Sequence, residues 1–196
     1  MADTGAPHFI PFADPTDLVR DWPALSEDVA DAVAAGLTAA GNAGIGSNVV
    51  STTKTDVFTT ASTSFTALTG LSATITPTSA TSKILVTATV MVGANSNNIG
   101  YLQLLRGASD LIVADSPGSR TASWTGFMAN FASAGFVVAP QTVTFLDSPS
   151  TTAATTYSVN IRVNGGTWYV NRSEQDENNA DNVRGVSTIT AIEVAA

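Results

Sequence analysis

Apolar and polar residues alternate along most of the chain, from about Ser47 to the C-terminus. In the segment Lys83–Val92, apolar side chains occupy every second position from Ile84 onward. Successive side chains of a strand point to opposite faces, so this pattern predicts a strand with one buried face. We expect similar strands at Leu71–Thr76, Tyr101–Arg106, Leu111–Asp115, Phe136–Leu146, Tyr157–Val163, Trp168–Asn171 and Val186–Val194.

Residues that favour turns separate these runs, at 77–79, 95–98, 106–109, 116–118, 147–149 and 164–166. The last of them, Asn164-Gly165-Gly166, predicts a tight hairpin between Arg162 and Trp168. Roughly eight to ten strands with no helix between them favour an all-β fold. We expect an antiparallel β-sandwich of jelly-roll type, with a closed barrel as the alternative.

One short helix is predicted before the strands, over residues 25–41. Apolar residues recur there at spacings of three and four, in a stripe that includes Leu25, Val29, Val33 and Leu37. Ser26 suits the N-cap, and Gly41 can end the helix. A helix this short is marginal alone in water, so it must pack on its own sandwich or in a bundle with other copies. We favour the bundle.

The first 24 residues contain four prolines, which exclude a helix through this stretch. They also carry large apolar side chains, which are Phe9, Ile10, Phe12, Leu18, Val19 and Trp22. We expect an extended arm whose side chains fit pockets on a partner; the alternative is that the arm lies on its own domain. With the helix and a Gly-rich hinge at 41–46, the arm forms an N-terminal region, 1–46, before a sandwich domain at 47–196.

Composition favours a protein that is packed against other subunits. Only 12% of the residues are charged, about half the usual share for a soluble domain. Small neutral polar residues fill the gap, and a surface made of them costs little to desolvate. The simpler interpretation is a general preference for Ala and Thr in the source organism.

Charge and cysteine content exclude several classes of function. The net charge of −8 disfavours contact with nucleic acid, whose phosphates an acidic surface repels. The chain has no cysteine, which excludes disulfides, thiolate metal sites and cysteine nucleophiles. No segment approaches the roughly 20 apolar residues that a membrane helix needs. The first 13 residues do not resemble an export signal, so we expect synthesis in the cytoplasm without membrane insertion.

No set of residues predicts catalysis or a bound cofactor. His8, the one histidine, precedes the β domain, where a Ser-His-Asp arrangement is not expected. The acids in the β region mostly flank turns, and we expect Glu193 on the polar side of the last strand. Glycan hydrolysis, which uses a pair of carboxylates, is therefore the less favoured alternative. No nucleotide-binding or zinc motif is present.

The segment 171–185 is the strongest polar cluster. It contains four acids whose oxygens could bind calcium: Glu174, Asp176, Glu177 and Asp181. Their spacing does not match an EF-hand, and a long solvated loop is the simpler interpretation. Asn171-Arg172-Ser173 matches a glycosylation triplet, which is a chance match in a protein that is not exported. Trp168 and Tyr169 are adjacent on a predicted strand and therefore face opposite ways.

Two segments resemble proteins of bacteriophage particles. IPFADPTDLVRDWPALSEDVADAVAAGL resembles the opening of short tail-fibre or minor tail proteins, with the likeness carried by Pro11, Asp14, Pro15, Asp17, Val19, Arg20, Asp21 and Pro23. VVSTTKTDVFTTASTSFTALTGLSATITPTSATSKILV, followed later by GGTWYVNRS and STITAIEVA, is similar to a β domain of phage virion proteins.

The resemblance implies a non-enzymatic structural subunit of the virion, either a fibre on the tail or head or a decoration protein. It also implies a homotrimer that contacts other capsid or tail proteins. A module that binds a glycan or protein on the host surface is the alternative, and aromatic residues near Trp124, Trp168 or Tyr169 would be its candidates. A secreted adhesin would need an export route that the sequence does not indicate.

Overall fold

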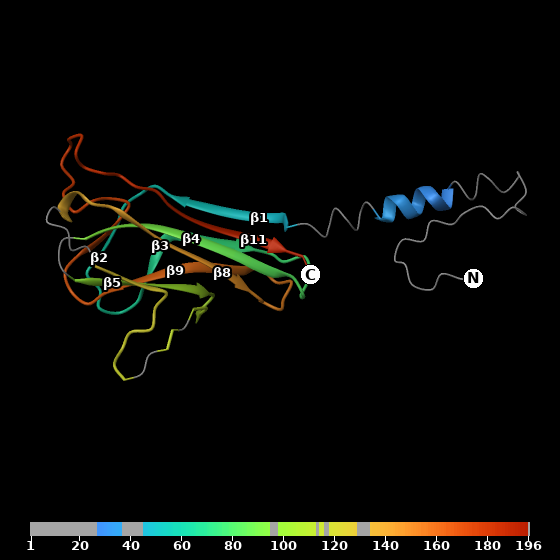
Figure 1. The fold of residues 1–196 in the computed structure, drawn as a ribbon, viewed down its shortest axis with the longest axis horizontal. Helices are drawn as coiled ribbons and strands as arrows, with labels where there is room; N and C mark the ends of the chain where they lie inside the picture. The colour runs from blue at the N-terminus through green and yellow to red at the C-terminus, as the bar shows by residue number, and fades with distance from the viewer. Residues whose placement is uncertain are drawn as a thin grey trace, which may run out of the picture.

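The computed structural model describes residues 27–36, 45–94, 98–112, 114–115, 118–128 and 134–195. Within these residues the chain forms two packed antiparallel sheets and one short α-helix, at 27–36 (Figure 1). The predicted all-β sandwich is confirmed, and the alternative of a single closed barrel is wrong.

The first sheet, sheet A, contains six strand segments that occupy four positions. These segments are β1 (Ile45–Lys54), β2 (Phe58–Thr60), β4 (Lys83–Ala94), β8 (Ala139–Asp147), β10 (Trp168–Val170) and β11 (Ser187–Val194). Both β11 and β10 pair with β4, at its residues 83–89 and 92–94, so they lie end to end along one side of it. Strand β8 lies along the other side of β4, and β1 and β2 pair with β11 and β10.

The second sheet, sheet B, is built in the same way. Its segments are β3 (Thr66–Ile75), β5 (Ile99–Arg106), β6 (Ser109–Asp110), β7 (Thr125–Met128) and β9 (Thr155–Val163). Strand β9 lies between β3 and β5, while β6 and β7 lie end to end along the other side of β5. A short 3₁₀ helix, η2 (Ala134–Phe136), precedes β8.

Counted in chain order, with β1/β2, β6/β7 and β10/β11 each taken as one strand, the molecule has eight strand positions. Sheet A has the order 1-8-3-6 and sheet B the order 2-7-4-5. Successive strands thus alternate between the two sheets, except for the fourth and fifth. This is the connectivity of a jelly roll, an eight-stranded double-sheet fold made of two Greek keys.

The core lies between the inner faces of the two sheets. On β4 the five alternating residues from Ile84 to Val92 are all buried, as their period-two spacing predicts. Trp168 is 2% exposed and packs flat against Gly100, where a Cβ atom would come within 2.6 Å of the indole ring. Phe127 meets the same indole edge-on, with ring centroids 5.6 Å apart. Gly100 is therefore required by close packing.

The predicted hairpin at 164–166 is wrong. Strand β9 belongs to sheet B and β10 to sheet A, so this turn crosses from one sheet to the other. Asn164 holds the crossing in place, because its Oδ1 accepts a hydrogen bond of 2.6 Å from the Ile99 amide. Both flanking strands direct buried residues into one core, Val163 from one sheet and Trp168 from the other.

Other strand boundaries also differ from expectation. No strand forms at 111–115 within the described residues, where Leu111 and Ile112 instead pack against the core from a loop. Strand β8 begins at Ala139, because residues 134–136 form η2. The sequence pattern did not predict β1, β2, β6 or β7. The last two residues of the expected hinge, 45 and 46, belong to β1.

Candidate functional site

Most of the residues predicted for the N-terminal arm and the helix stripe lie outside the residues that the structure describes. The arm residues Phe9, Ile10, Phe12, Leu18, Val19 and Trp22, and the helix residues Leu25 and Leu37, lie outside the described residues. The helix itself is formed over 27–36, inside the predicted range. Val29 is partly buried and Val33 is 45% exposed. The part of the apolar stripe that lies within 27–36 is therefore largely uncovered in the single chain. No helix among the described residues is long and apolar enough to cross a membrane.

The polar segment singled out in the sequence forms an excursion from sheet A, which we call the 171–186 excursion. It leaves after β10 and returns at β11, two segments that otherwise form one strand along β4. Its base is a short antiparallel stem. The Gly185 amide donates to the Asn171 carbonyl at 2.9 Å, and the Ser173 amide donates to the Val183 carbonyl at 3.2 Å. The base of this segment is therefore an ordered part of the fold, whereas residues 175–181 are exposed, as expected for a solvated loop.

Asn171 closes the base of this excursion. Its Nδ2 donates to the carbonyls of Lys54 and Asp56 at 2.8 and 3.0 Å. These carbonyls lie at the end of β1 and before β2, where the pairing of β1 with β11 ends. Its Oδ1 accepts from the Ser187 hydroxyl at 2.6 Å, and its own amide donates to the Met91 carbonyl. The Asn171 side chain therefore provides the hydrogen bonds that a paired strand would otherwise make with these carbonyls. Because Asn171 is fully buried, the glycosylation triplet offers no accessible acceptor in the folded chain.

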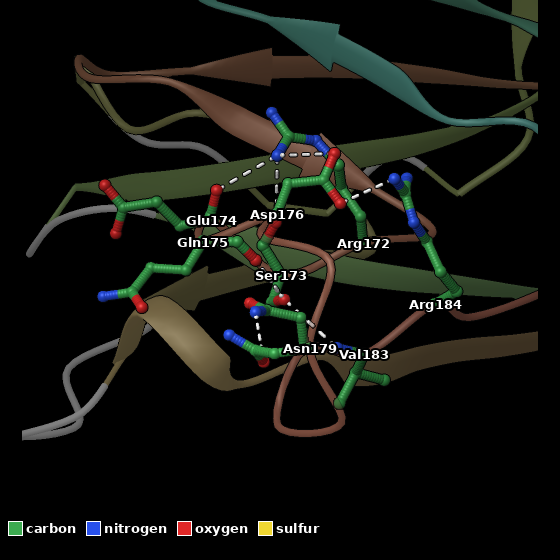
Figure 2. A network of polar contacts seen from close by, with 9 residues as sticks. Arg172, Ser173, Glu174, Gln175, Asp176, Asn179, Val183 and Arg184 are labelled. Atoms are coloured by element: carbon green, nitrogen blue, oxygen red, sulfur yellow. Dashed lines mark hydrogen bonds and ion pairs between the residues drawn. The ribbon is translucent and has the colours of Figure 1, made fainter.

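The acids of this excursion are not gathered as ligands of one metal ion, and Figure 2 shows Asp176 beside Arg172 and Arg184. The Asp176 carboxylate lies between two guanidinium groups, 2.6 Å from Arg184 Nη2 and 3.4 Å from Arg172 Nη1. Arg172 also stacks over the Tyr169 ring, 4.0 Å from its centroid. Among the described residues, no three His, Asp or Glu side chains gather as a metal would require. Asp176 thus has cationic partners from its own chain, and the structure does not bring Glu174, Glu177 and Asp181 to it as ligands.

The placement of Glu193 corrects the prediction of a polar-side residue. It is fully buried and faces inward from β11. Its carboxylate accepts hydrogen bonds from the Thr78 amide and hydroxyl at 2.8 and 2.6 Å, and from Asn48 at 3.1 Å. Burial opposes the charge and raises the pKa, but the hydrogen bonds, led by that of Thr78, outweigh burial and lower the pKa of Glu193 to about 2.

Asp147, the last residue of β8, is a second buried acid. Asp147 and Glu193 are both cross-strand partners of Ile84, and they lie on opposite sides of β4. Arg106 Nη1 lies 2.9 Å from each of its carboxylate oxygens, and the Tyr157 hydroxyl donates to it at 2.7 Å. Burial and the hydrogen bond to Asp147 raise the pKa of Tyr157. A glycosidase acid needs a raised carboxyl pKa. Glu193 shows the opposite shift, so it lacks the property that such an acid requires.

The aromatic residues proposed for ligand contact are engaged within the fold. Trp168 is buried against Gly100, and Trp124 packs against the edge of the core. Tyr169 does face away from Trp168, as predicted, but Arg172 covers its ring. These three residues therefore do not form an exposed aromatic platform.

The outer face of sheet A, which the sequence did not single out, carries rows of matched side chains across four strands. The first row is apolar and consists of Val49, Ile192, Leu85 and Leu146, each opposite the next in register. The two ends of this row, Val49 and Leu146, are 50% and 47% exposed. Large aliphatic side chains thus form a continuous band across the outside of the sheet.

Two further rows on the same face consist of hydroxyl residues. They are Ser51, Thr190, Thr87 and Thr144, and then Thr53, Thr188, Thr89 and Thr142. Hydroxyls of neighbouring strands bond to one another, as in the contacts Ser51–Thr190 at 2.9 Å, Thr87–Thr144 at 3.2 Å and Thr89–Thr142 at 3.0 Å. Cross-strand Thr pairs of this kind stabilise a sheet.

None of the residues in these three rows is charged. Exposed sheets usually carry Lys or Glu, which prevent unintended association. The strand alternation alone identifies which residues face outward, but the rows depend on strand order, which sequence reasoning did not provide. A scan against models of known protein families finds no match to this chain, and a search of curated proteins finds none either.

Proposed function

We propose that this chain is a non-enzymatic structural subunit of a bacteriophage particle. It is a trimeric fibre or decoration subunit that binds the capsid or tail through its N-terminal region. The β-sandwich projects outward from that attachment. The virion assignment rests on the resemblance of the arm and β domain to phage proteins, and the proposal locates the protein in the particle.

The observation that carries the assembly role is the uncovered apolar stripe of the helix at 27–36. Val33 is 45% exposed in the single chain, and the helix is only ten residues long. An isolated helix of this length is not stable in water, because its few hydrogen bonds do not offset the entropy lost when the first turn forms. Covering its stripe by other subunits would supply the missing stability, at about 25 cal/mol per Å² of apolar surface.

The buried acids support a role without catalysis. Asp147 and Glu193 both face the interior, and both are saturated by partners from the fold. The alternative function, binding a host glycan or protein, gains no support from Trp124, Trp168 and Tyr169. Their rings are engaged within the fold.

The first test is incorporation into particles. Removing residues 1–24 should leave a folded sandwich that is absent from purified particles, as detected by an antibody against the β domain. Val33→Asp should also reduce incorporation, whereas Ala35→Asp, on the opposite side of the helix, should not. Normal incorporation of the shortened chain would contradict attachment by the arm. Absence of the wild-type chain from particles would contradict the virion role.

The second test is the mass of the purified full-length chain by light scattering. A trimer of the 20.0 kDa chain has a mass of three times that value, about 60 kDa. A monomer at micromolar concentration would contradict an autonomous trimeric fibre, and would favour a decoration subunit that assembles only on the particle.

A further inference from the structure

We propose that the outer face of sheet A is an interface between copies of this chain. The inference rests on the proposed role in assembly and adds a second contact to that of the N-terminal region. Its basis is the apolar row centred on Leu85 and the two hydroxyl rows beside it. Together these rows extend across all four strand positions of the sheet.

Charge indicates which partner fits this face. The chain carries a net charge of −8, so two copies repel each other wherever their acidic surfaces meet. The three rows contain no charged residue, and like-charged copies can therefore meet here without burying a carboxylate. A basic protein, a nucleic acid or an anionic membrane would need a cluster of charges, whereas the three rows carry none and Lys83, which lies in the next row on β4, is a single lysine.

The side chains of this face are also chemically complementary to those of the same face on a second copy. A hydroxyl both donates and accepts hydrogen bonds, so a row such as the one containing Thr87 can pair with an identical row and leave no group unsatisfied. An aliphatic row such as that of Leu85 is likewise best covered by another aliphatic row. Rows of lysine or aspartate would not have this property.

The direction of the rows fits a symmetric assembly. Each row crosses the strands, because its members are direct cross-strand partners such as Thr87 and Thr144. Around a symmetry axis parallel to the strands, each row becomes one layer of the assembly. One layer is aliphatic and two consist of hydroxyls, and every layer meets the same layer of the other copies. The exposed ends of the aliphatic row, Val49 and Leu146, are buried by this packing.

The absence of native cysteine allows a direct test by cross-linking. Thr87→Cys places a thiol at the centre of the proposed interface in the full-length chain. Ser158→Cys is the matched control, because Ser158 is a partly exposed residue on the outer side of β9, an inner strand of sheet B. With a short bis-maleimide, Thr87→Cys should give covalently linked copies and Ser158→Cys should remain single chains on a denaturing gel.

A charge variant provides the second measurement. Leu85→Asp should weaken self-association by more than about tenfold, because each copy would bury an unpaired carboxylate in the aliphatic layer. Ser158→Asp should retain the wild-type mass by light scattering, and circular dichroism should show both variants folded. The proposal is overturned if Leu85→Asp keeps the wild-type mass, or if Thr87→Cys links no better than Ser158→Cys.

These outcomes are separable from failure of the proposed function. A chain that enters particles normally, but whose Thr87→Cys variant does not cross-link within those particles, keeps its virion role and loses this interface. A chain that cross-links at Thr87 in solution but is absent from particles keeps the interface and loses the virion role.

Discussion

At the scale of single residues, buried polar side chains complete the structure where the strands are interrupted. Asn171 adopts a left-handed backbone conformation, with φ of 64°, and bridges three segments through its side-chain amide. Asparagine tolerates this conformation better than most residues, and its amide both donates and accepts. The position thus needs both an unusual backbone and a two-sided hydrogen-bonding group.

Two substitutions of Asn171 distinguish the contribution of the backbone conformation from that of the side-chain hydrogen bonds. Asn171→Gly keeps the backbone conformation but loses three hydrogen bonds, and we expect it to lower the free energy of unfolding by about 2–4 kcal/mol. Asn171→Ala adds backbone strain of about 1 kcal/mol to that loss. Urea unfolding measures both. A glycine variant as stable as the wild type would show that the hydrogen bonds contribute no net stability.

Glu193 makes stability dependent on pH. Its pKa is about 2 in the folded chain and 4.5 ordinarily, so the unfolded chain binds the proton more readily. The stability that its charge contributes is present above about pH 4.5 and is lost as the pH falls toward 2. Glu193→Gln should be less stable than the wild type at pH 7, and the difference should shrink over that acid range.

Denaturant unfolding at several pH values measures this difference. Asp181→Asn is the control, since Asp181 is exposed in the 171–186 excursion and its loss should leave the profile unchanged. An equal pH dependence in the Glu193→Gln variant would contradict the role of this carboxylate.

At the scale of elements, both sheets contain a strand that is split by an excursion. In sheet A the 171–186 excursion separates β10 from β11, and in sheet B the segment after β6 leaves β5 and returns at β7. The Leu111 and Trp124 amides still donate to carbonyls of β5, at 2.9 and 3.0 Å, on either side of that second break. The ladder therefore continues close to each break, so the strands on the two sides act as one.

The outer part of the 171–186 excursion should be dispensable for folding. Replacing residues 174–182 by Asn-Gly retains the stem, and we expect a loss of no more than about 1–2 kcal/mol, since partly exposed ion pairs contribute little. Replacing 171–187 by the same dipeptide also removes Asn171 and Ser187 and should unfold the domain. Urea unfolding compares the two, and equal stability would contradict the importance of the base.

At the scale of the whole molecule, the buried core residues that the structure describes all lie between Leu68 and Ala191, and Val50 and Phe58 pack against them. The helix at 27–36 contributes no residue to this core. The sandwich therefore has its own source of stability, which is packing between the sheets. Under the proposed function, the N-terminal region would instead be stabilised by contact with other subunits.

The fragment 45–196 should consequently fold without the N-terminal region. We expect one cooperative thermal transition and dispersed amide resonances, as for a domain with its own core. If the fragment is oligomeric by light scattering, sheet A contributes to association without the helix. A fragment that lacks a cooperative transition would contradict the independence of the two regions.

The sequence by itself determined the local features of this protein. The alternation in Lys83–Val92 specified a strand and its buried face, because side-chain direction along a strand is a local property. The same reasoning located most strands and the helix. It did not locate β1, whose last four residues, 51–54, are all polar. It also missed β2, β6 and β7, which are too short to show a pattern.

Only the tertiary structure decided which strands are neighbours, because pairing depends on contacts between residues far apart in the chain. The turn at 164–166 crosses between sheets although its residues favour a hairpin. Glu193 faces inward because Thr78 and Asn48, from distant segments, satisfy its charge there. The rows on the outer face of sheet A, such as Ser51, Thr190 and Thr87, likewise exist only once β1, β11 and β4 are placed side by side.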